Sequence, residues 1–162
     1  MGSTDKYATR LCLKKSDAFA HQESLDLSDE ELADCSSLVL NAVHNSLTMP
    51  NGQWLFLQSH LSTQVEHPIA WRDGMLLRES RLDLVLIDQE ERHWIIDFKL
   101  VEHSSNRESE LRSRYETQLS HYARIYREKL RSEANLQTPE NLGLHCALYL
   151  PLNDKLLILN EN

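Results

Sequence analysis

The apolar and polar positions of this chain follow a helical period first and a strand period afterwards. Ser28-Asp29-Glu30-Glu31 has the form of a capping box, so we expect a helix to begin there. Apolar or small residues then fall on one side at helical spacing, namely Leu32, Cys35, Val39, Ala42, Val43 and Ser46. Pro50-Asn51-Gly52 is expected to stop this run. We therefore expect the apolar side of this helix to pack against another element.

The middle of the chain changes to an alternating period that is typical of strands. After a short segment around Trp54 to His60, strands are expected at Thr63–Trp71, Met75–Asp88 and His93–Leu100, separated by Asp73-Gly74 and by Gln89-Glu90-Glu91. A long charged helix is expected at Arg107–Ala134, and two more strands at Leu144–Leu150 and Lys155–Leu159, after breaks at Pro139-Glu140-Asn141 and Pro151–Asp154. This order predicts an α/β fold with a mixed β-sheet flanked by helices.

The length and composition fit one domain. With 162 residues, of which 41% are apolar and 26% charged, the chain can bury one core, so we expect a single domain over residues 1–162. Residues 1–25 have no clear period, and Met1-Gly2-Ser3 could be an expression remnant. The three cysteines are far apart, which indicates neither disulfides nor zinc and favours the reducing cytoplasm. No apolar run suggests a membrane span or a signal peptide.

The formal charge of −8 argues weakly against tight, non-specific binding to nucleic acid. The expected long helix is nevertheless rich in basic residues: Arg107, Arg112, Arg114, Arg124, Arg127, Lys129 and Arg131. Acidic residues alternate with them, namely Glu108, Glu110, Glu116 and Glu128. A solvated, salt-bridged face and a phosphate-facing surface are equally good interpretations of this pattern.

Charged residues interrupt two of the expected apolar strands. The segments are Arg81-Leu82-Asp83-Leu84-Val85 and Ile95-Ile96-Asp97-Phe98-Lys99. Because alternate side chains of a strand share a face, Asp97 and Lys99 are expected to point the same way. A charged pair in an apolar strand is costly unless it has a function.

The loop between these strands predicts how they pair. If residues 89–91 form the loop, Asp88 lies opposite Arg92, and counting back along both strands places Asp83 opposite Asp97. Opposed residues have Cβ atoms roughly 4.5 to 5.5 Å apart, and two carboxylates at that separation repel unless a cation or a proton lies between them. The pattern therefore predicts a metal site on Asp83 and Asp97.

Magnesium suits such a site, because Mg²⁺ takes oxygen ligands and is usually held by one or two carboxylates plus substrate phosphates. We expect Mg²⁺ as the cofactor, with Mn²⁺ as a substitute. Lys99 would stabilise charge on a scissile phosphate or help to position the attacking water. The predicted reaction is phosphodiester hydrolysis, with Asp83, Asp97 and Lys99 as the catalytic residues.

These residues resemble a known family. Asp83, followed by the strand with Asp97-Phe98-Lys99, is similar to the PD-(D/E)XK nuclease superfamily, and specifically to the RecB/AddA-like C-terminal nuclease domain of UvrD-type helicases. That group carries Gly-x-x-Asp followed by Asp-Tyr-Lys, and here Ser80 stands in the Gly position and Phe98 in the Tyr position. The resemblance covers roughly Glu66 to Lys129 and implies a restriction-endonuclease-like fold.

The same group has a Gln-x-x-x-Tyr motif on the helix after the catalytic strand, and Gln118 and Tyr122 match it. Four residues apart on a helix, both side chains lie on one face, where Gln118 could order the site or contact DNA. The resemblance implies a metal-dependent DNA exonuclease or endonuclease. Its implied partner is a helicase subunit, or a helicase domain of a longer polypeptide, in recombinational DNA repair.

One motif of the family is missing, because its first motif is a His on an earlier helix, preceded by a Gly, and the chain has no Gly-x-x-x-His. His44 lies on the expected first helix but points away from the apolar side, so we expect an exposed histidine instead of a ligand. Glu66 could add a carboxylate or proton acceptor, although a structural role suits a strand position near Pro68 better. The alternative is a catalytically incomplete domain of the same fold that binds DNA or a helicase.

Overall fold

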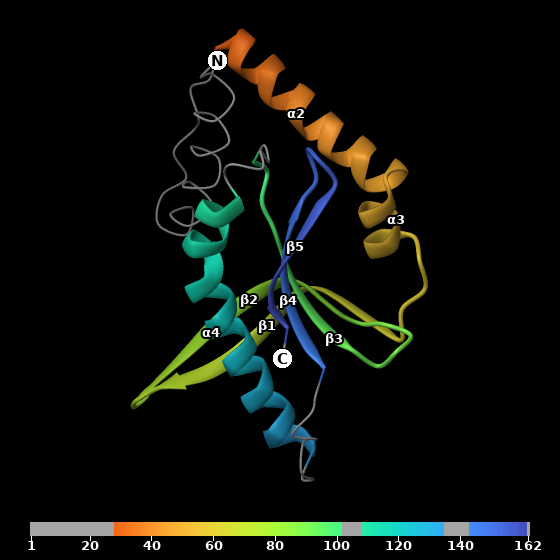
Figure 1. Cartoon of the computed structure of the whole chain (residues 1–162). Helices are drawn as coiled ribbons and strands as arrows, with labels where there is room; N and C mark the ends of the chain where they lie inside the picture. The colour runs from red at the N-terminus through yellow and green to blue at the C-terminus, as the bar shows by residue number, and fades with distance from the viewer. Residues whose placement is uncertain (1–27, 102–107, 135–142, 162) are drawn as a thin grey trace. The chain divides into compact units, whose positions relative to one another are not determined.

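The structure is a computed structural model, and it describes residues 28–101, 108–134 and 143–161. Over these residues the protein is α/β, with helices and a five-stranded sheet. The elements are α2 (Asp29–Thr48), α3 (Pro50–Phe56), β1 (Ser62–Asp73), β2 (Leu76–Ile87), β3 (His93–Phe98), α4 (Glu108–Ala134), β4 (Leu144–Leu150) and β5 (Lys155–Glu161) (Figure 1). No helix in these ranges is long and apolar enough to cross a membrane.

The chain divides into two compact units. The first consists of Met1–Leu57, Lys99–Ser104 and Leu150–Lys155, and the second of Gln58–Phe98, Ser105–Tyr149 and Leu156–Asn162. Helices α2 and α3 therefore belong to the first unit, and α4 and most of the sheet to the second. Three of the sequence expectations lie outside the described residues: the segment 1–25, the start of the long helix at Arg107, and the break at Pro139-Glu140-Asn141.

The sheet has the strand order β1-β2-β3-β4-β5. Strands β1 and β2 are antiparallel, as are β2 and β3, whereas β3 and β4 are parallel. A parallel pair needs a long crossover connection, and α4 lies between β3 and β4 in the chain. The predicted mixed sheet is confirmed at this level, and the strand positions agree closely with the alternating pattern.

The second unit has its core where β2, β3, β4 and α4 meet. The side chains of Leu82, Leu84 and Leu86 on β2 are essentially buried, and so are Ile95 and Ile96 on β3. Strands that are covered on both faces are expected to be almost continuously apolar, which fits the second half of β2 and β3. Helix α4 contributes further buried residues, namely Leu119, Ala123, Ile125 and Tyr126.

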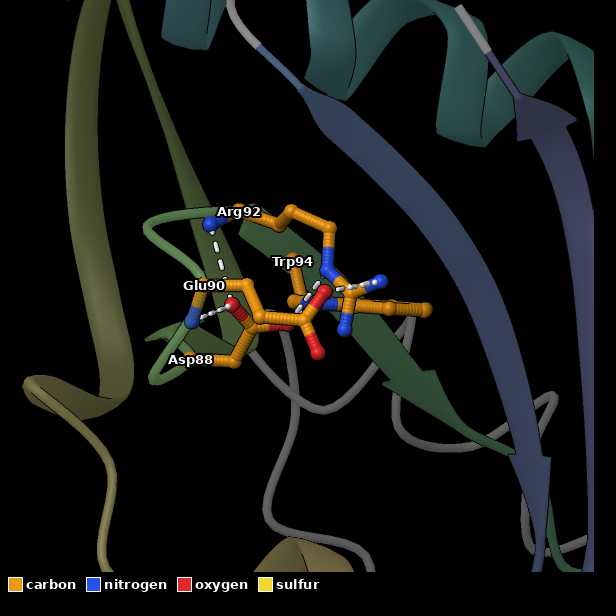
Figure 2. A network of polar contacts seen from close by, with 4 residues as sticks. All are labelled: Asp88, Glu90, Arg92 and Trp94. Carbon is orange, nitrogen blue, oxygen red and sulfur yellow. Dashed lines mark hydrogen bonds and ion pairs between the residues drawn. The ribbon is translucent and has the colours of Figure 1, made fainter.

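The loop between β2 and β3 is organised by the buried side chain of Asp88, which is only 4% exposed (Figure 2). One carboxylate oxygen accepts from the backbone N–H groups of Glu90 and Arg92 at 2.9 and 3.0 Å. The other accepts from Arg92 Nε at 2.8 Å and from Trp94 Nε1 at 2.9 Å. Burial raises the pKa of Asp88, but the hydrogen bonds from Trp94, Arg92 and Glu90 outweigh it and lower the pKa to about 2.

The low pKa of Asp88 predicts a loss of stability in acid. Because the folded-state pKa lies below the unfolded one, the contribution is complete above about pH 4 to 5 and disappears as the pH falls towards 2. It amounts to about 2 kcal/mol. When the pH is lowered from 6 to 3, the free energy of unfolding, measured by urea denaturation, should therefore fall less in Asp88→Asn than in the unsubstituted protein. An equal loss in both proteins, with the exposed Asp73→Asn as control, would contradict the assignment.

Helix α2 begins as its sequence predicts. The backbone N–H of Glu31 donates to Ser28 Oγ at 3.3 Å, and the backbone N–H of Ser28 donates to Glu31 Oε2 at 3.0 Å, which completes the capping box. Pro50 does more than stop this helix, because it occupies the first turn of α3, where its fixed φ suits a helix start.

The expected packing face of α2 is largely wrong. Ala42 is buried, but Leu32, Val39 and Val43 are 55%, 49% and 51% exposed. The helix contacts its own unit along a narrower edge, where Asn45 Nδ2 donates to the carbonyl oxygens of Pro151 and Leu152, each at 2.9 Å. A periodic apolar stripe predicts which side chains share a side, but the width of the partner surface decides how many of them become buried.

Asp154, in the turn between β4 and β5, caps α3 from a distance. Its two carboxylate oxygens accept from the backbone N–H groups of Asn51 at 2.9 Å and Gly52 at 2.7 Å. These N–H groups lie in the first turn of a helix and have no partner within it. The N-cap residue Met49 offers no side-chain acceptor, so Asp154 supplies the missing one.

Candidate functional site

The pairing of β2 with β3 runs up to the residues next to Asp83 and Asp97. Leu84 pairs with Ile96 and Val85 with Ile95, and one further step of the same register would place Asp83 opposite Asp97. The backbone N–H of Asp88 donates to the carbonyl of Arg92 at 3.0 Å, as the predicted loop requires. Opposed residues of an antiparallel pair project from the same face. The register predicted from the sequence is confirmed from Leu84 with Ile96 to Ile87 with His93.

Hydrogen bonds fix both carboxylates. The backbone N–H of Phe98 donates to Asp83 Oδ2 at 3.0 Å, which links the acidic side chain of β2 directly to the backbone of β3. Gln118 on α4 lies 3.4 Å from Asp97 Oδ1 through its amide nitrogen, a long hydrogen bond, and the same nitrogen donates to Tyr122 Oη at 2.9 Å. These four side chains lie on three elements, β2, β3 and α4. We call Asp83 and Asp97 the acidic pair. We call Gln118, whose amide contacts Asp97, and Tyr122, which accepts from that amide, the amide support.

The two carboxylates differ in their access to solvent. Asp97 is 4% exposed, whereas Asp83 is half-buried, so the open side of the acidic pair is at Asp83. If the register continues to these residues, the two carboxylates lie close enough to repel each other, and a cation between them would relieve the repulsion.

Asp83 and Asp97 offer two carboxylates as possible metal ligands. No group of three or more His, Cys, Asp or Glu side chains that could hold a metal occurs within the described ranges. Mg²⁺ is usually held by one or two carboxylates and keeps several waters or phosphate oxygens as its other ligands. The acidic pair could supply the two carboxylates, and a phosphate backbone the rest.

Glu66 is placed next to this site by the register but is oriented unusually. Val65 pairs with Leu84 and His67 with Leu82, so Glu66 stands across from Asp83 on β1. Its φ of 50° is in the left-handed region, which costs a residue with a side chain on the order of 1 kcal/mol. Glu66 is exposed and lies within β1, as the sequence predicts, and the pairing with β2 continues on both sides of it.

Lys99 and His44 belong to the first unit, in contrast to the acidic pair. The prediction that the strand continues to Leu100 is wrong, because β3 pairs with β4 only as far as Phe98. Without a partner strand, alternation no longer fixes the direction of the Lys99 side chain, which is half-buried. His44 is exposed on α2, as its helical position predicts.

The sequence reasoning missed one cluster in the second unit, formed by Trp71 on β1 with His121 and Arg124 on α4. The three-residue spacing of His121 and Arg124 places them on one side of a helix, which is a usable signal. No pattern in the sequence indicated that Trp71, about 50 positions earlier, would meet them.

Comparisons of the chain with models of protein families and with curated proteins found no match. The function is therefore argued from the side chains described above. The acidic pair, its amide support and the nearby aromatic cluster are the features that carry chemistry.

Proposed function

We propose that this chain is a metal-dependent DNA nuclease domain with a restriction-endonuclease-like fold, similar to the RecB/AddA-like members of the PD-(D/E)XK superfamily. The observation that carries the proposal is the pairing of Leu84 with Ile96, which would continue to Asp83 and Asp97, together with the contact of Gln118 with Asp97. Three short motifs that are weak alone thus contribute to one cluster: the Asp of the first, the Asp-Phe-Lys strand, and the Gln-x-x-x-Tyr helix.

In this proposal each side chain has one task. Asp83 and Asp97 would hold Mg²⁺, or Mn²⁺ in its place, and the bound ion would orient the scissile phosphate and lower the pKa of the attacking water. Gln118 and Tyr122 would keep Asp97 in position, and Lys99 would stabilise negative charge that develops on the phosphate. The substrate would approach from the Asp83 side, which is the more exposed one.

The biological setting follows from the family resemblance alone. Such a domain would work in the cytoplasm with a helicase subunit, or with a helicase domain of a longer polypeptide, in recombinational DNA repair.

The metal site is tested by isothermal titration of the chain with Mg²⁺ and with Mn²⁺. We expect binding that disappears in Asp83→Ala, because the variant loses the more exposed of the two carboxylates and keeps only the buried Asp97. Asp73→Ala is the matched control, since Asp73 is exposed and forms an ion pair with Arg78. Equal heats for the unsubstituted chain and Asp83→Ala would refute the metal site.

A second function is favoured by the burial of Asp97 and by the bond from the Phe98 N–H to Asp83, which occupies one carboxylate oxygen. Both features suit a domain of the same fold that has become catalytically incomplete and acts as a module for binding DNA or a helicase. Cleavage of linear DNA separates the two functions. A chain that binds DNA and cuts none of it in Mg²⁺ or Mn²⁺ is the module.

A further inference from the structure

The indole of Trp71 is held between a strand and a helix. Its Nε1 donates to Ser80 Oγ on β2 at 3.1 Å. The His121 ring meets it edge-on, with centroids 4.5 Å apart, and the Arg124 guanidinium lies 5.7 Å from the ring centroid. Trp71 is half-buried, so part of the ring surface stays accessible. We call Trp71, His121 and Arg124 the aromatic cluster.

Two arginines lie near Trp71 in the structure. Arg124 lies over the ring, and Arg78 is the cross-strand partner of Trp71. Arg124 pairs with Glu128 and Arg78 with Asp73, each at 2.8 Å, and all four side chains are about half exposed. Exposed ion pairs contribute about 0 to 1 kcal/mol, so a phosphate group can replace either carboxylate at small cost.

His121 keeps Arg124 in place. Burial and the positive charge of Arg124 lower the pKa of His121, with Glu128 opposing them, so the ring is neutral at pH 7. The neutral ring lies 3.2 Å from Arg124 through its Nδ1, where it can accept a hydrogen bond from the guanidinium. The aromatic cluster is thus ordered in advance, which reduces the entropy that a ligand must remove.

The aromatic cluster is continuous with the acidic pair along α4. Gln118 contacts Asp97 and Tyr122, and the Tyr122 ring lies 6.2 Å from that of His121. Six residues separate Gln118 from Arg124, which is about 9 Å of helix rise. One short oligonucleotide could therefore contact both groups.

We propose that the aromatic cluster binds single-stranded DNA, with one unpaired base stacked on Trp71 and the adjoining phosphates held by Arg124 and Arg78. Stacking on aromatic rings beside arginines is the usual chemistry of single-strand binding. A base in a duplex is already stacked between its neighbours and is not available to the indole. The inference rests on the proposed nuclease function in one respect, namely that the bound DNA strand runs from the aromatic cluster towards Asp97.

The test measures fluorescence anisotropy of a labelled oligothymidylate of about 20 nucleotides, with EDTA present so that no metal-dependent step contributes. Trp71→Ala should weaken binding about tenfold or more, and Trp71→Phe should retain most of it. Arg124→Gln should weaken binding and reduce the slope of log affinity against log salt by about 0.7, the loss of one phosphate contact to a single strand. Arg131→Gln, also exposed on α4, is the matched control and should bind like the unsubstituted chain.

Circular dichroism of each variant shows that a loss of binding is not a loss of folding, and Arg124→Gln covers the case in which Trp71→Ala unfolds. Binding that is unchanged in both variants overturns the inference, and so does equal affinity for a duplex of the same length. These outcomes do not depend on catalysis. If binding needs Trp71 and Arg124 but no metal binds, the aromatic cluster stands and the nuclease proposal fails.

Discussion

Replacing Lys99 with alanine should reduce Mg²⁺-dependent cleavage of linear DNA by about 100-fold or more, the effect of removing one group that stabilises transition-state charge. In the proposed site Lys99 is not a metal ligand, so Mg²⁺ binding measured by titration should survive the substitution. Single-turnover cleavage of an end-labelled DNA, with enzyme in excess, measures the rate of the chemical step and leaves product release out.

Lys155 provides the control for this substitution. It is also half-buried and belongs to the same compact unit, at the start of β5. Lys155→Ala should cleave at the rate of the unsubstituted chain. Cleavage by Lys99→Ala at that same rate would remove Lys99 from the mechanism, and a parallel loss in both variants would indicate a general effect of removing lysine from this unit.

The register of the acidic pair could be predicted from the sequence because it depends on local information. Alternation identified β2 and β3, and the polar run from Gln89 to Glu91 identified the loop. Once the loop is known, every residue of one strand has one partner on the other. The capping box at Ser28 was predictable for the same reason, since all of its atoms lie within four residues.

Contacts between distant segments could not be predicted in this way. The sequence gives no distance between Trp71 and Arg124, or between Gly52 and Asp154, because such contacts depend on how whole elements pack. The end of β3 shows the same limit. The pattern extends the expected strand to Leu100, but β3 ends at Phe98, together with its pairing to β4.

The charge pattern of α4 shows how the two interpretations of a charged helix can both hold. Ion pairs one turn apart join Glu108 with Arg112 and Arg124 with Glu128, as a salt-bridged face predicts. The arginine of one ion pair, Arg124, also lies over the ring of Trp71. The arginine of the other, Arg112, also donates a hydrogen bond to the carbonyl oxygen of Ile158. The phosphate-binding role proposed above concerns Arg124, which lies over the indole of Trp71.

Replacing Gly52 with alanine should lower the free energy of unfolding by about 3 kcal/mol or more, the upper range for overpacking a tight site. A Cβ at this position would lie 2.4 Å from both Cα and the carbonyl oxygen of Ser46. These are backbone atoms of α2, so no side-chain rotation can relieve the overlap. Displacing α3 instead would pull the Gly52 N–H away from Asp154, which accepts its hydrogen bond at 2.7 Å.

The sign of this effect is what makes it informative, since an exposed Gly→Ala change inside a helix normally stabilises by about 1 kcal/mol. Two other glycines serve as controls in urea denaturation. The atom nearest to a Cβ at Gly143 would be Cγ of the Arg92 side chain, at 3.4 Å. A Cβ at Gly74 meets nothing within 4 Å, but Gly74 has a φ of +60°. We expect the free energy of unfolding to change by about 0.5 kcal/mol or less in Gly143→Ala. In Gly74→Ala it should fall by about 1 kcal/mol, because of the positive φ. If Gly52→Ala were as stable as Gly143→Ala, the close approach of α3 to α2 would be wrong.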